Sequence, residues 1–392
     1  MTLLSTSMVV DPSIQLPLDK LIQTFAEYKT FYLKPGNYEI YDQILINSDN
    51  IQIIGESGDP KDVHIFQKTL DKNGIVINAD NITIKYISVH VETGGGISLT
   101  CKASDRTIVE YCHFYGNDNT FTVFYSGPEL SSGIDTLNGY DNDILDSGNI
   151  FKNNIVYSKW SGDCVAFSLQ KNGFVLNNLI RGGKLAIYMV KDVNVMHNYI
   201  YDSSAHGIFC SFPSKNIIMS YNTIRDCVSS AITCKMQLEH GEYTNSAIGI
   251  GNISITNNMI QDAGYIGIEV NNYKGKINNN NILWTKEVAI FINNSSDTEI
   301  INNVCSHFLR GIHVDINVTN LSINNNKLYS VYPENATFGV LIEPNTSNVV
   351  VMNNDISGQC TTDYIRNNGD NTIGNNTVKL YHNFYDEYIN IL

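Results

Sequence analysis

The chain has 392 residues, with 25 Lys and Arg against 39 Asp and Glu, so its formal net charge is −14. Nucleic acids and anionic membrane surfaces attract proteins through an excess of Lys and Arg, so this charge argues against both kinds of partner. Charged residues make up 16% of the chain and hydrophobic residues 43%, which excludes a disordered acidic tail. No segment approaches the ~18 consecutive apolar residues of a membrane-spanning helix.

The first 18 residues lack the basic start and apolar core of a secretory signal peptide. A virion or cytoplasmic location is therefore expected over secretion, and the host and compartment stay open. The eight cysteines are few for this length, and Cys210 and Cys234 occupy alternating apolar positions. This pattern predicts buried free thiols rather than disulfides.

The first predicted element is a short helix at residues 19–28. Leu21, Ile22, Phe25 and Ala26 recur there at helical spacing. The segments 31–38 and 51–55 follow it and open the part of the chain that is rich in Ile, Val and Asn.

From residue 153 onward, a short unit recurs along the chain. It consists of an apolar strand, a pair that is usually Asn-Asn, and two further residues, of which the second is usually apolar. The second residues of successive pairs lie 20 to 36 positions apart, most often 22 to 24, which is typical of a solenoid with a few insertions. These second residues are Asn154, Asn178, Asn198, Asn222, Asn258, Asn280, Asn303, Asn326, Asn354 and Asn376.

The residues within each period indicate strands. In the segment 311–315, Ile312 and Val314 alternate with His313 and Asp315, which predicts two inward and two outward side chains. Leucine-rich repeats need a Leu consensus and helical repeats need a 3.6-residue period, and both are absent. We therefore predict an all-β solenoid of about a dozen coils, each with three short strands, whose Asn residues stack at one bend.

This repeat, together with the segments 31–38 and 51–55, resembles the pectate-lyase-like right-handed parallel β-helix superfamily over roughly residues 30–380. The resemblance implies one single-stranded β-helix domain over 1–392, with an N-terminal arm and capping helix at 1–30, coils at 31–378 and a C-terminal cap at 379–392. The superfamily includes polysaccharide lyases, glycoside hydrolases, uronan epimerases, phage tailspikes and carbohydrate-binding modules. The resemblance therefore specifies the fold without choosing among these functions.

Two insertions interrupt the repeat, at about 126–147 and 235–247. Insertions in a solenoid leave the coils at a corner and build the functional surface. Both follow the same strand of their coils, so we expect them to border one groove. Its floor is predicted to carry rings, amides and hydroxyls, which suit a sugar chain; the residues are Ser168, Gln170, Tyr188, Phe209, Ser211 and Thr233.

The predicted catalytic residues are Lys235, Glu239, His240 and Glu269, in the second insertion and the coil after it. Such residues could supply either the two carboxylates of a hydrolase or the base and cation of a uronan lyase or epimerase. Three further candidates lie at bends and are as typical of turns as of catalysis, namely Asp163, Lys191 and Asp192. A fourth, His206 before Gly207, resembles a polygalacturonase pattern of the superfamily in only two residues, and the Asn-Thr-Asp element of that enzyme is missing.

The first insertion holds Asp141, Asp143 and Asp146, whose spacing suits oxygen ligation of calcium but lacks a complete calcium-loop pattern. The expected cofactor is therefore none, or Ca²⁺. We predict a carbohydrate-active protein that binds an extended polysaccharide in the groove and, if it is an enzyme, cleaves or epimerises it. The alternative is a non-enzymatic virion, fibre or surface component that uses the β-helix as a rigid platform. Assembly into a homo-oligomer, such as a trimer, stays open.

Overall fold

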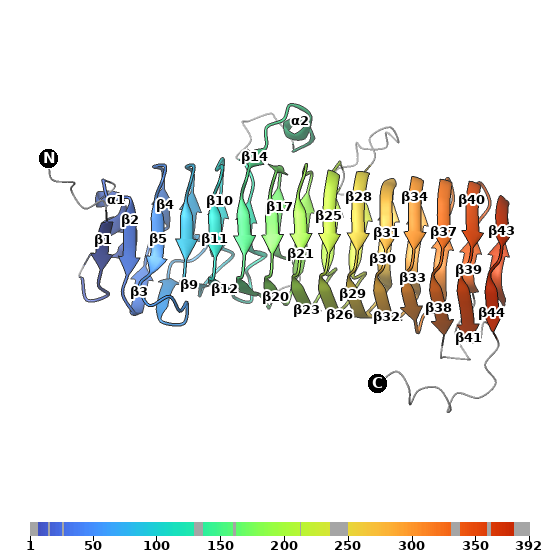
Figure 1. The fold of residues 1–392 in the computed structure, drawn as a ribbon. Coiled ribbons are helices and arrows are strands. Elements are labelled where there is room, and N and C mark those ends of the chain that lie inside the picture. The colour runs from blue at the N-terminus through green and yellow to red at the C-terminus, as the bar shows by residue number, and fades with distance from the viewer. Residues whose placement is uncertain are drawn as a thin grey trace. The chain divides into compact units, whose positions relative to one another are not determined.

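Two compact units make up the chain, Met1–Phe209 and Cys210–Leu392. The computed structural model describes residues 7–14, 16–25, 27–128, 136–159, 162–211, 213–235, 250–330, 338–358 and 362–379. In each unit, every coil contributes one strand to each of three parallel sheets, named A, B and C in chain order (Figure 1). Within the described residues each unit has about seven coils, so the chain has about 14 coils rather than the expected dozen. The Asn pairs undercount them because the first coils lack the pair.

In the first unit, sheet A consists of β1 (Ser7–Val10), β2 (Thr30–Leu33), β5 (Gln52–Gly55), β8 (Thr83–Lys85), β11 (Ile108–Glu110), β15 (Ile150–Lys152), β19 (Phe174–Leu176) and β22 (Asn194–Met196). Sheet B consists of β3 (Gly36–Ile40), β6 (Val63–Gln67), β9 (Ser88–Val91), β12 (His113–Tyr115), β16 (Ile155–Tyr157), β20 (Leu179–Arg181) and β23 (Tyr199–Ser203). Sheet C consists of β4 (Ile44–Ile46), β7 (Ile75–Ile77), β10 (Leu99–Cys101), β13 (Thr122–Ser126), β17 (Asp163–Ser168), β21 (Lys184–Tyr188) and β24 (Ile208–Ser211), at which the unit ends. A small sheet pairs β14 (Asp146–Ser147) with β18 (Gln170–Lys171), and the helices are α1 (Leu18–Thr24) and α2 (Thr136–Asp141).

In the second unit, sheet A consists of β25 (Lys215–Ser220), β28 (Ile250–Thr256), β31 (Tyr273–Asn278), β34 (Ser296–Ile301), β37 (Thr319–Asn324), β40 (Ser347–Met352) and β43 (Asp370–Gly374). Sheet B consists of β26 (Thr223–Cys227), β29 (Met259–Ala263), β32 (Asn281–Thr285), β35 (Val304–Ser306), β38 (Lys327–Ser330), β41 (Asp355–Gly358) and β44 (Thr377–Lys379). Sheet C consists of β27 (Ile232–Lys235), β30 (Ile266–Asn271), β33 (Val288–Asn293), β36 (Arg310–Val314), β39 (Phe338–Ile342) and β42 (Asp363–Asn367).

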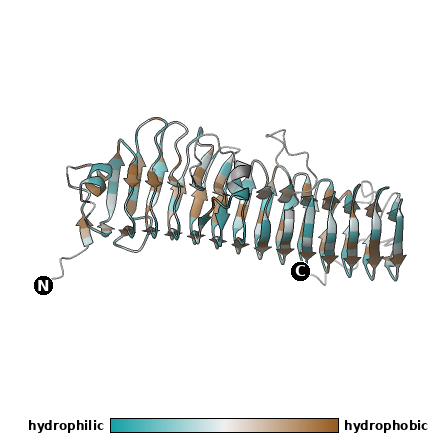
Figure 2. Ribbon diagram, turned by 90° about the horizontal axis from the view of Figure 1, so that it is seen from above, coloured by the Kyte–Doolittle hydropathy of each residue, from teal (hydrophilic) through white to brown (hydrophobic). Residues whose placement is uncertain are grey.

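The core of each unit lies inside the coils, where apolar side chains of the same register level stack on one another. In sheet A of the first unit, Ile84 pairs with Val109, which pairs with Phe151, and all three are buried. Apolar and polar residues alternate along most strands (Figure 2), because successive side chains of a strand point to opposite faces. The alternation therefore separates a dry interior from a polar exterior.

The recurrent Asn pair has two different roles at one bend. The first residue has a left-handed backbone, as in Asn302 with a φ of 58°, which Asn tolerates better than most residues. The second residue is buried: Asn303 Nδ2 donates to the carbonyl of Ile277 at 2.7 Å and to Asn326 Oδ1 at 3.0 Å. The Asn280 backbone N–H donates in turn to Asn303 Oδ1 at 2.9 Å. Each buried amide thus binds the coils on both sides of it.

The N-terminal helix α1 is shorter than the predicted 19–28. Its residues Leu18, Leu21 and Ile22 are buried, and it packs on β3 and β4, so it covers the first coil as expected. The expected C-terminal cap lies almost entirely outside the described residues. Because both units repeat one kind of coil, a single domain over 1–392 stays our prediction.

The seven cysteines among the described residues are free and buried, which confirms the prediction of buried thiols for them. Within the same residues, no helix is long and apolar enough to cross a membrane.

We expect Asn303→Ala to lower the free energy of unfolding by about 1 to 3 kcal/mol, because it leaves the Ile277 carbonyl and the Asn280 N–H without their partner in a buried site. Asn281→Ala is the matched control, since Asn281 is the next residue after a buried ladder position and is itself exposed. Asn281→Ala should lower the free energy of unfolding by less than about 0.5 kcal/mol. Denaturant unfolding of both variants checks this. Equal effects would show that the buried amide contributes no more to stability than an exposed one.

Candidate functional site

A polar cluster surrounds Glu269 on the outward face of sheet C in the second unit. Glu269 points outward because its strand neighbours Ile268 and Val270 fill the interior. Its carboxylate accepts hydrogen bonds from Ser230 Oγ at 2.9 Å and Lys235 Nζ at 2.9 Å. The Glu269 side chain retains 14% of its exposure, so solvent reaches this ion pair.

The adjacent strand completes this cluster. Thr233 of β27 pairs in register with Glu269 of β30, and its Oγ1 lies 3.4 Å from Glu269 Oε2. The structure therefore brings together Lys235, Glu269 and Thr233, three of the residues selected from the sequence. Ser230 was missed because it precedes β27 at a bend, where the period-two pattern has not yet begun. The predicted Glu239 and His240 lie outside the described residues.

The same outward row continues over the next two coils. Glu269 pairs with Phe291, which pairs with His313. The His313 ring meets the Phe291 ring edge-on at 5.2 Å, and its Nε2 lies 3.6 Å from Glu343 Oε1. Burial and the neighbouring Arg310 hold the pKa of His313 below its ordinary value, so its imidazole is neutral at neutral pH. Along this row a partly exposed carboxylate and a partly exposed aromatic ring thus lie between a buried hydroxyl and a buried, neutral imidazole.

A second cluster lies on the outward face of sheet C in the first unit. Asp163 begins β17 and is buried, and its Oδ2 accepts a hydrogen bond from Tyr188 Oη at 2.8 Å. Lys184 Nζ lies 3.1 Å from Asp163 Oδ1 and 5.1 Å from the centre of the Phe209 ring. Tyr188 and Phe209, both predicted from the sequence, are 6.1 Å apart between ring centres. Asp163 is therefore an ion-pair partner, and it is more than a turn residue.

Five of the six predicted floor residues are buried. Strand β17 ends at Ser168, and Leu169 takes a left-handed backbone with a φ of 50°, so the alternation stops before Gln170. Gln170 instead lies in β18, fully buried, where it accepts a hydrogen bond from Asn149 Nδ2 at 2.9 Å. Ser211 is buried as well, as is Thr233 beneath Glu269. Ser168 and Phe209 are buried too, so the floor predicted from the sequence is mostly covered and only Tyr188 of its residues stays partly exposed.

The acidic residues of the first insertion are held by lysines. Asp143 is exposed, and its two carboxylate oxygens lie 2.8 Å from Lys171 Nζ and 3.0 Å from Lys191 Nζ. These hydrogen bonds lower the pKa of Asp143 to about 2. Lys191 also lies over the Tyr140 ring at 4.4 Å, so the contacts fasten α2 to the coils. Asp141 is exposed at the end of α2.

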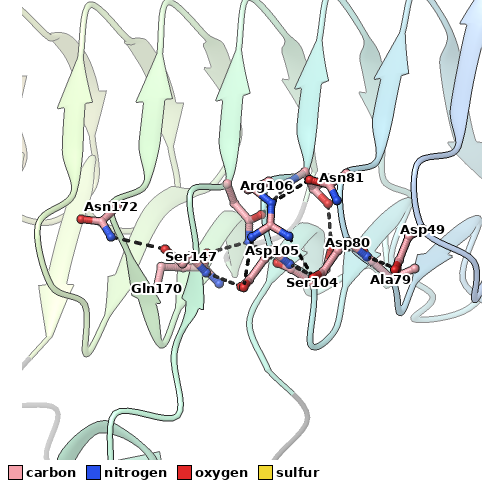
Figure 3. A network of polar contacts seen from close by, with 12 residues as sticks. Asp49, Ala79, Asp80, Asn81, Ser104, Asp105, Arg106, Ser147, Gln170 and Asn172 are labelled. Atoms are coloured by element: carbon pink, nitrogen blue, oxygen red, sulfur yellow. Dashed lines mark hydrogen bonds and ion pairs between the residues drawn. The ribbon is translucent and has the colours of Figure 1, made fainter.

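Asp146 is buried, and the residue after it, Ser147, joins a ladder of aspartates (Figure 3). In that ladder, the backbone N–H of Asp105 donates to Asp80 Oδ1 at 2.9 Å, and that of Ser147 donates to Asp105 Oδ1 at 2.7 Å. Arg106 balances the ladder through Asp80 Oδ2 at 3.1 Å. Burial raises the pKa of Asp146 to about 7, and the carboxylates of Asp105 and Asp80 add to this rise, against the hydrogen bonds from Ser104 and Gln170.

The residues Asp141, Asp143 and Asp146 do not fit a calcium ion. Asp143 is neutralised by two lysines, and Asp146 is partly protonated near neutral pH, whereas calcium takes ionised carboxylates. Among the described residues, no group of three or more His, Cys, Asp or Glu side chains is placed to hold a metal ion. The spacing of these aspartates in the sequence suggested calcium ligation, because the sequence alone does not show that the folded coils place Lys171 and Lys191 beside Asp143.

The family described as a right handed beta helix region matches residues 134–237 and 238–378. No curated protein matches the sequence. Among solved structures, the Dettilon tailspike protein has a TM-score of 0.54 at 12% identity, covering 91% of this chain and 68% of that one. The Agl-KA catalytic domain has a TM-score of 0.54 at 12% identity, covering 94% and 66%.

A catalytic domain of GH87 alpha-1,3-glucanase in complex with tetrasaccharides has a TM-score of 0.50 at 13% identity, covering 95% of this chain and 69% of that one. The chain thus spans about two thirds of the length of each of these structures. At such identities the likeness shows the fold alone.

We expect the stability of the protein to fall, relative to Asp146→Asn, as the pH rises from 4 to 8. The pKa of Asp146 is raised from 3.8 to about 7 in the folded state, so its stabilising contribution is full below pH 4 and is lost as the pH passes 7. At pH 8 the Asn variant should be more stable by on the order of a few kcal/mol.

Melting curves of both proteins at unit steps of pH test this expectation. Asp143→Asn is the control of opposite sign, because the pKa of Asp143 is lowered, and it should not raise the melting temperature at pH 8. Parallel curves for the parent and Asp146→Asn would contradict the expectation.

Proposed function

Because this chain belongs to the right-handed β-helix family, we propose that it binds an extended polysaccharide along the outward face of sheet C. The observation that carries the proposal is the outward row Thr233, Glu269, Phe291 and His313 of the second unit, which is in register over four neighbouring strands. Four strands at ~4.8 Å spacing span about 14 Å, the length of a short oligosaccharide.

The chemistry of this row suits sugars. Glu269 and Lys235 supply an acceptor and donors for hydroxyl groups, and they remain partly exposed. Phe291 is also partly exposed and offers an apolar surface between them and His313. A hydrophobic ring flanked by a few fixed polar groups is the usual composition of a small-molecule site.

One structural neighbour supports the same class of ligand. The catalytic domain of GH87 alpha-1,3-glucanase was solved in complex with tetrasaccharides. A similar fold makes a glycan a reasonable ligand for this chain, while the residues that would bind it are its own.

We further propose that, if the protein cleaves its glycan, Lys235, Glu239, His240 and Glu269 are the catalytic residues. Glu269 beside Lys235 offers a base and a cation, as a lyase or epimerase requires. A hydrolase requires two carboxylates about 5 to 10 Å apart, and Glu239 would have to supply the second. The alternative is a non-enzymatic virion, fibre or surface component that uses the β-helix as a rigid platform, and a tailspike protein is among the similar solved structures. Assembly into a homo-oligomer belongs to that alternative.

The double variant Lys235→Met with Glu269→Gln should weaken polysaccharide binding at least tenfold, or about 1.4 kcal/mol, while leaving the melting temperature nearly unchanged. Removing both charges together avoids leaving one of them unpaired in a half-buried site. The matched control is Lys276→Met with Glu299→Gln, an exposed ion pair at 3.4 Å on sheet A of the same unit. That control should bind as the parent does.

The assay is a panel of uronans and neutral glycans, with binding measured by calorimetry and cleavage measured by reducing ends or by absorbance of unsaturated products. Binding that survives the double variant would place the glycan elsewhere on the protein. A parent that binds no glycan in the panel would overturn the proposal and leave the structural alternative.

A further inference from the structure

Trp284 has a left-handed backbone near the end of β32, a strand of sheet B in the second unit. Arg225, Gln261, Leu283 and Ser306 pair in one register row, and the residue after each of them has a left-handed backbone. In the first two of these four coils that residue is an aspartate, which tolerates a left-handed backbone. The residues are Asp226 (φ 52°), Asp262 (φ 55°), Trp284 (φ 61°) and His307 (φ 56°). Other bends of this chain also hold a ring in this conformation, such as those of Tyr86, Tyr111 and Tyr221.

The position builds an aromatic platform. The Trp284 indole stacks on the His307 imidazole with 3.8 Å between ring centres and 14° between ring planes. Burial lowers the pKa of His307, so the stack is uncharged at neutral pH. The stack covers one face of the indole, while 39% of Trp284 stays exposed to solvent.

A surface hollow of about 600 Å³ adjoins this platform, within the second unit. Trp284 and His307 line it together with Asp262, Lys286, Phe308 and Thr285. Thr285 is only 5% exposed, and for its Oγ1 the described part of the chain provides no hydrogen-bond partner. A buried hydroxyl without a partner loses the hydrogen bonds that it makes in water, so a ligand atom that pairs with it would be favoured.

We propose that this hollow binds a pyranose residue of a glycan, as a site separate from the row on sheet C. The indole offers the apolar plane on which the C–H face of a sugar ring stacks. The Thr285 hydroxyl, the Lys286 ammonium and the Asp262 carboxylate provide donors and acceptors for sugar hydroxyls. A nucleobase would stack equally well, but its phosphates would meet a chain of net charge −14, and this favours an uncharged sugar. The volume lies within the ordinary range of small-ligand sites.

The chain contains two tryptophans, so Trp160→Phe leaves Trp284 as the single fluorescent reporter. The probes are neutral tetrasaccharides: α-linked glucans, β-linked glucans and an N-acetylglucosamine oligomer. At least one of them should change the fluorescence saturably, and AMP should not. A response to AMP and to no sugar, or no response to any sugar at millimolar concentration, overturns the proposal.

Two variants connect the signal to the hollow. Thr285→Val should weaken sugar binding at least fivefold and leave the melting temperature unchanged or higher, because the hydroxyl that is removed has no hydrogen-bond partner among the described residues. Trp284→Asp, which restores the residue of the two preceding coils, should abolish binding in calorimetry without loss of stability. A lower melting temperature for Thr285→Val would show that its hydroxyl has a structural partner, which contradicts the argument.

Two further variants test whether this site is distinct from the row on sheet C. Tyr221→Ala removes an exposed aromatic residue that does not line the hollow, and it should bind as the parent does. The variant Lys235→Met with Glu269→Gln should leave the Trp284 titration unchanged. Its loss in that variant would mean that one glycan occupies sheet C alone and the hollow is not a separate site.

Discussion

The register of parallel strand pairing is the constraint on which the other features of this protein depend. Each coil satisfies its backbone N–H and C=O groups through the coils on either side of it, so successive coils align residue by residue. Side chains of one register level therefore stack in rows. Inward rows, such as Ile84, Val109 and Phe151, become a continuous apolar core, and a polar residue in such a row would need a partner in the same row.

The buried asparagines meet that requirement by repetition. An Asn side chain carries both donors and an acceptor, so identical residues in a stack can bind one another, as Asn280, Asn303 and Asn326 do. The same logic applies to the ladder of Asp49, Asp80 and Asp105, where each carboxylate accepts a backbone N–H of the next coil. Carboxylates repel one another when stacked, which explains the position of Arg106. Burial is the main cause of the raised pKa of Asp146 beside the ladder, and the neighbouring carboxylates add to it.

The outward rows carry the candidate sites for the same reason. Thr233, Glu269, Phe291 and His313 are 22 to 36 residues apart in the sequence, and they are neighbours because they share a register level. Residues at the bends are also neighbours because they share a register level. A position that suits Asp in two coils holds Trp284 and His307 in the next two, and their rings stack because the coils do. In a solenoid, a change of residue type at one register level therefore brings a new functional group beside the side chains of the neighbouring coils.

The sequence by itself determined the repeating coil. The 22 to 24 residue period, the alternation within strands and the Asn pairs predicted an all-β parallel solenoid, because these patterns depend on local geometry and recur too often to arise by chance. It also indicated Lys235, Thr233 and Glu269, since alternation places them on one outward face. The tertiary structure alone decided the rest. Only the stacked coils show that Gln170 turns inward after Leu169, that two lysines hold Asp143, and that Ser230 joins Glu269. Such contacts join residues whose spacing depends on bends and insertions, where the period is interrupted and a pattern of alternating residues no longer predicts direction.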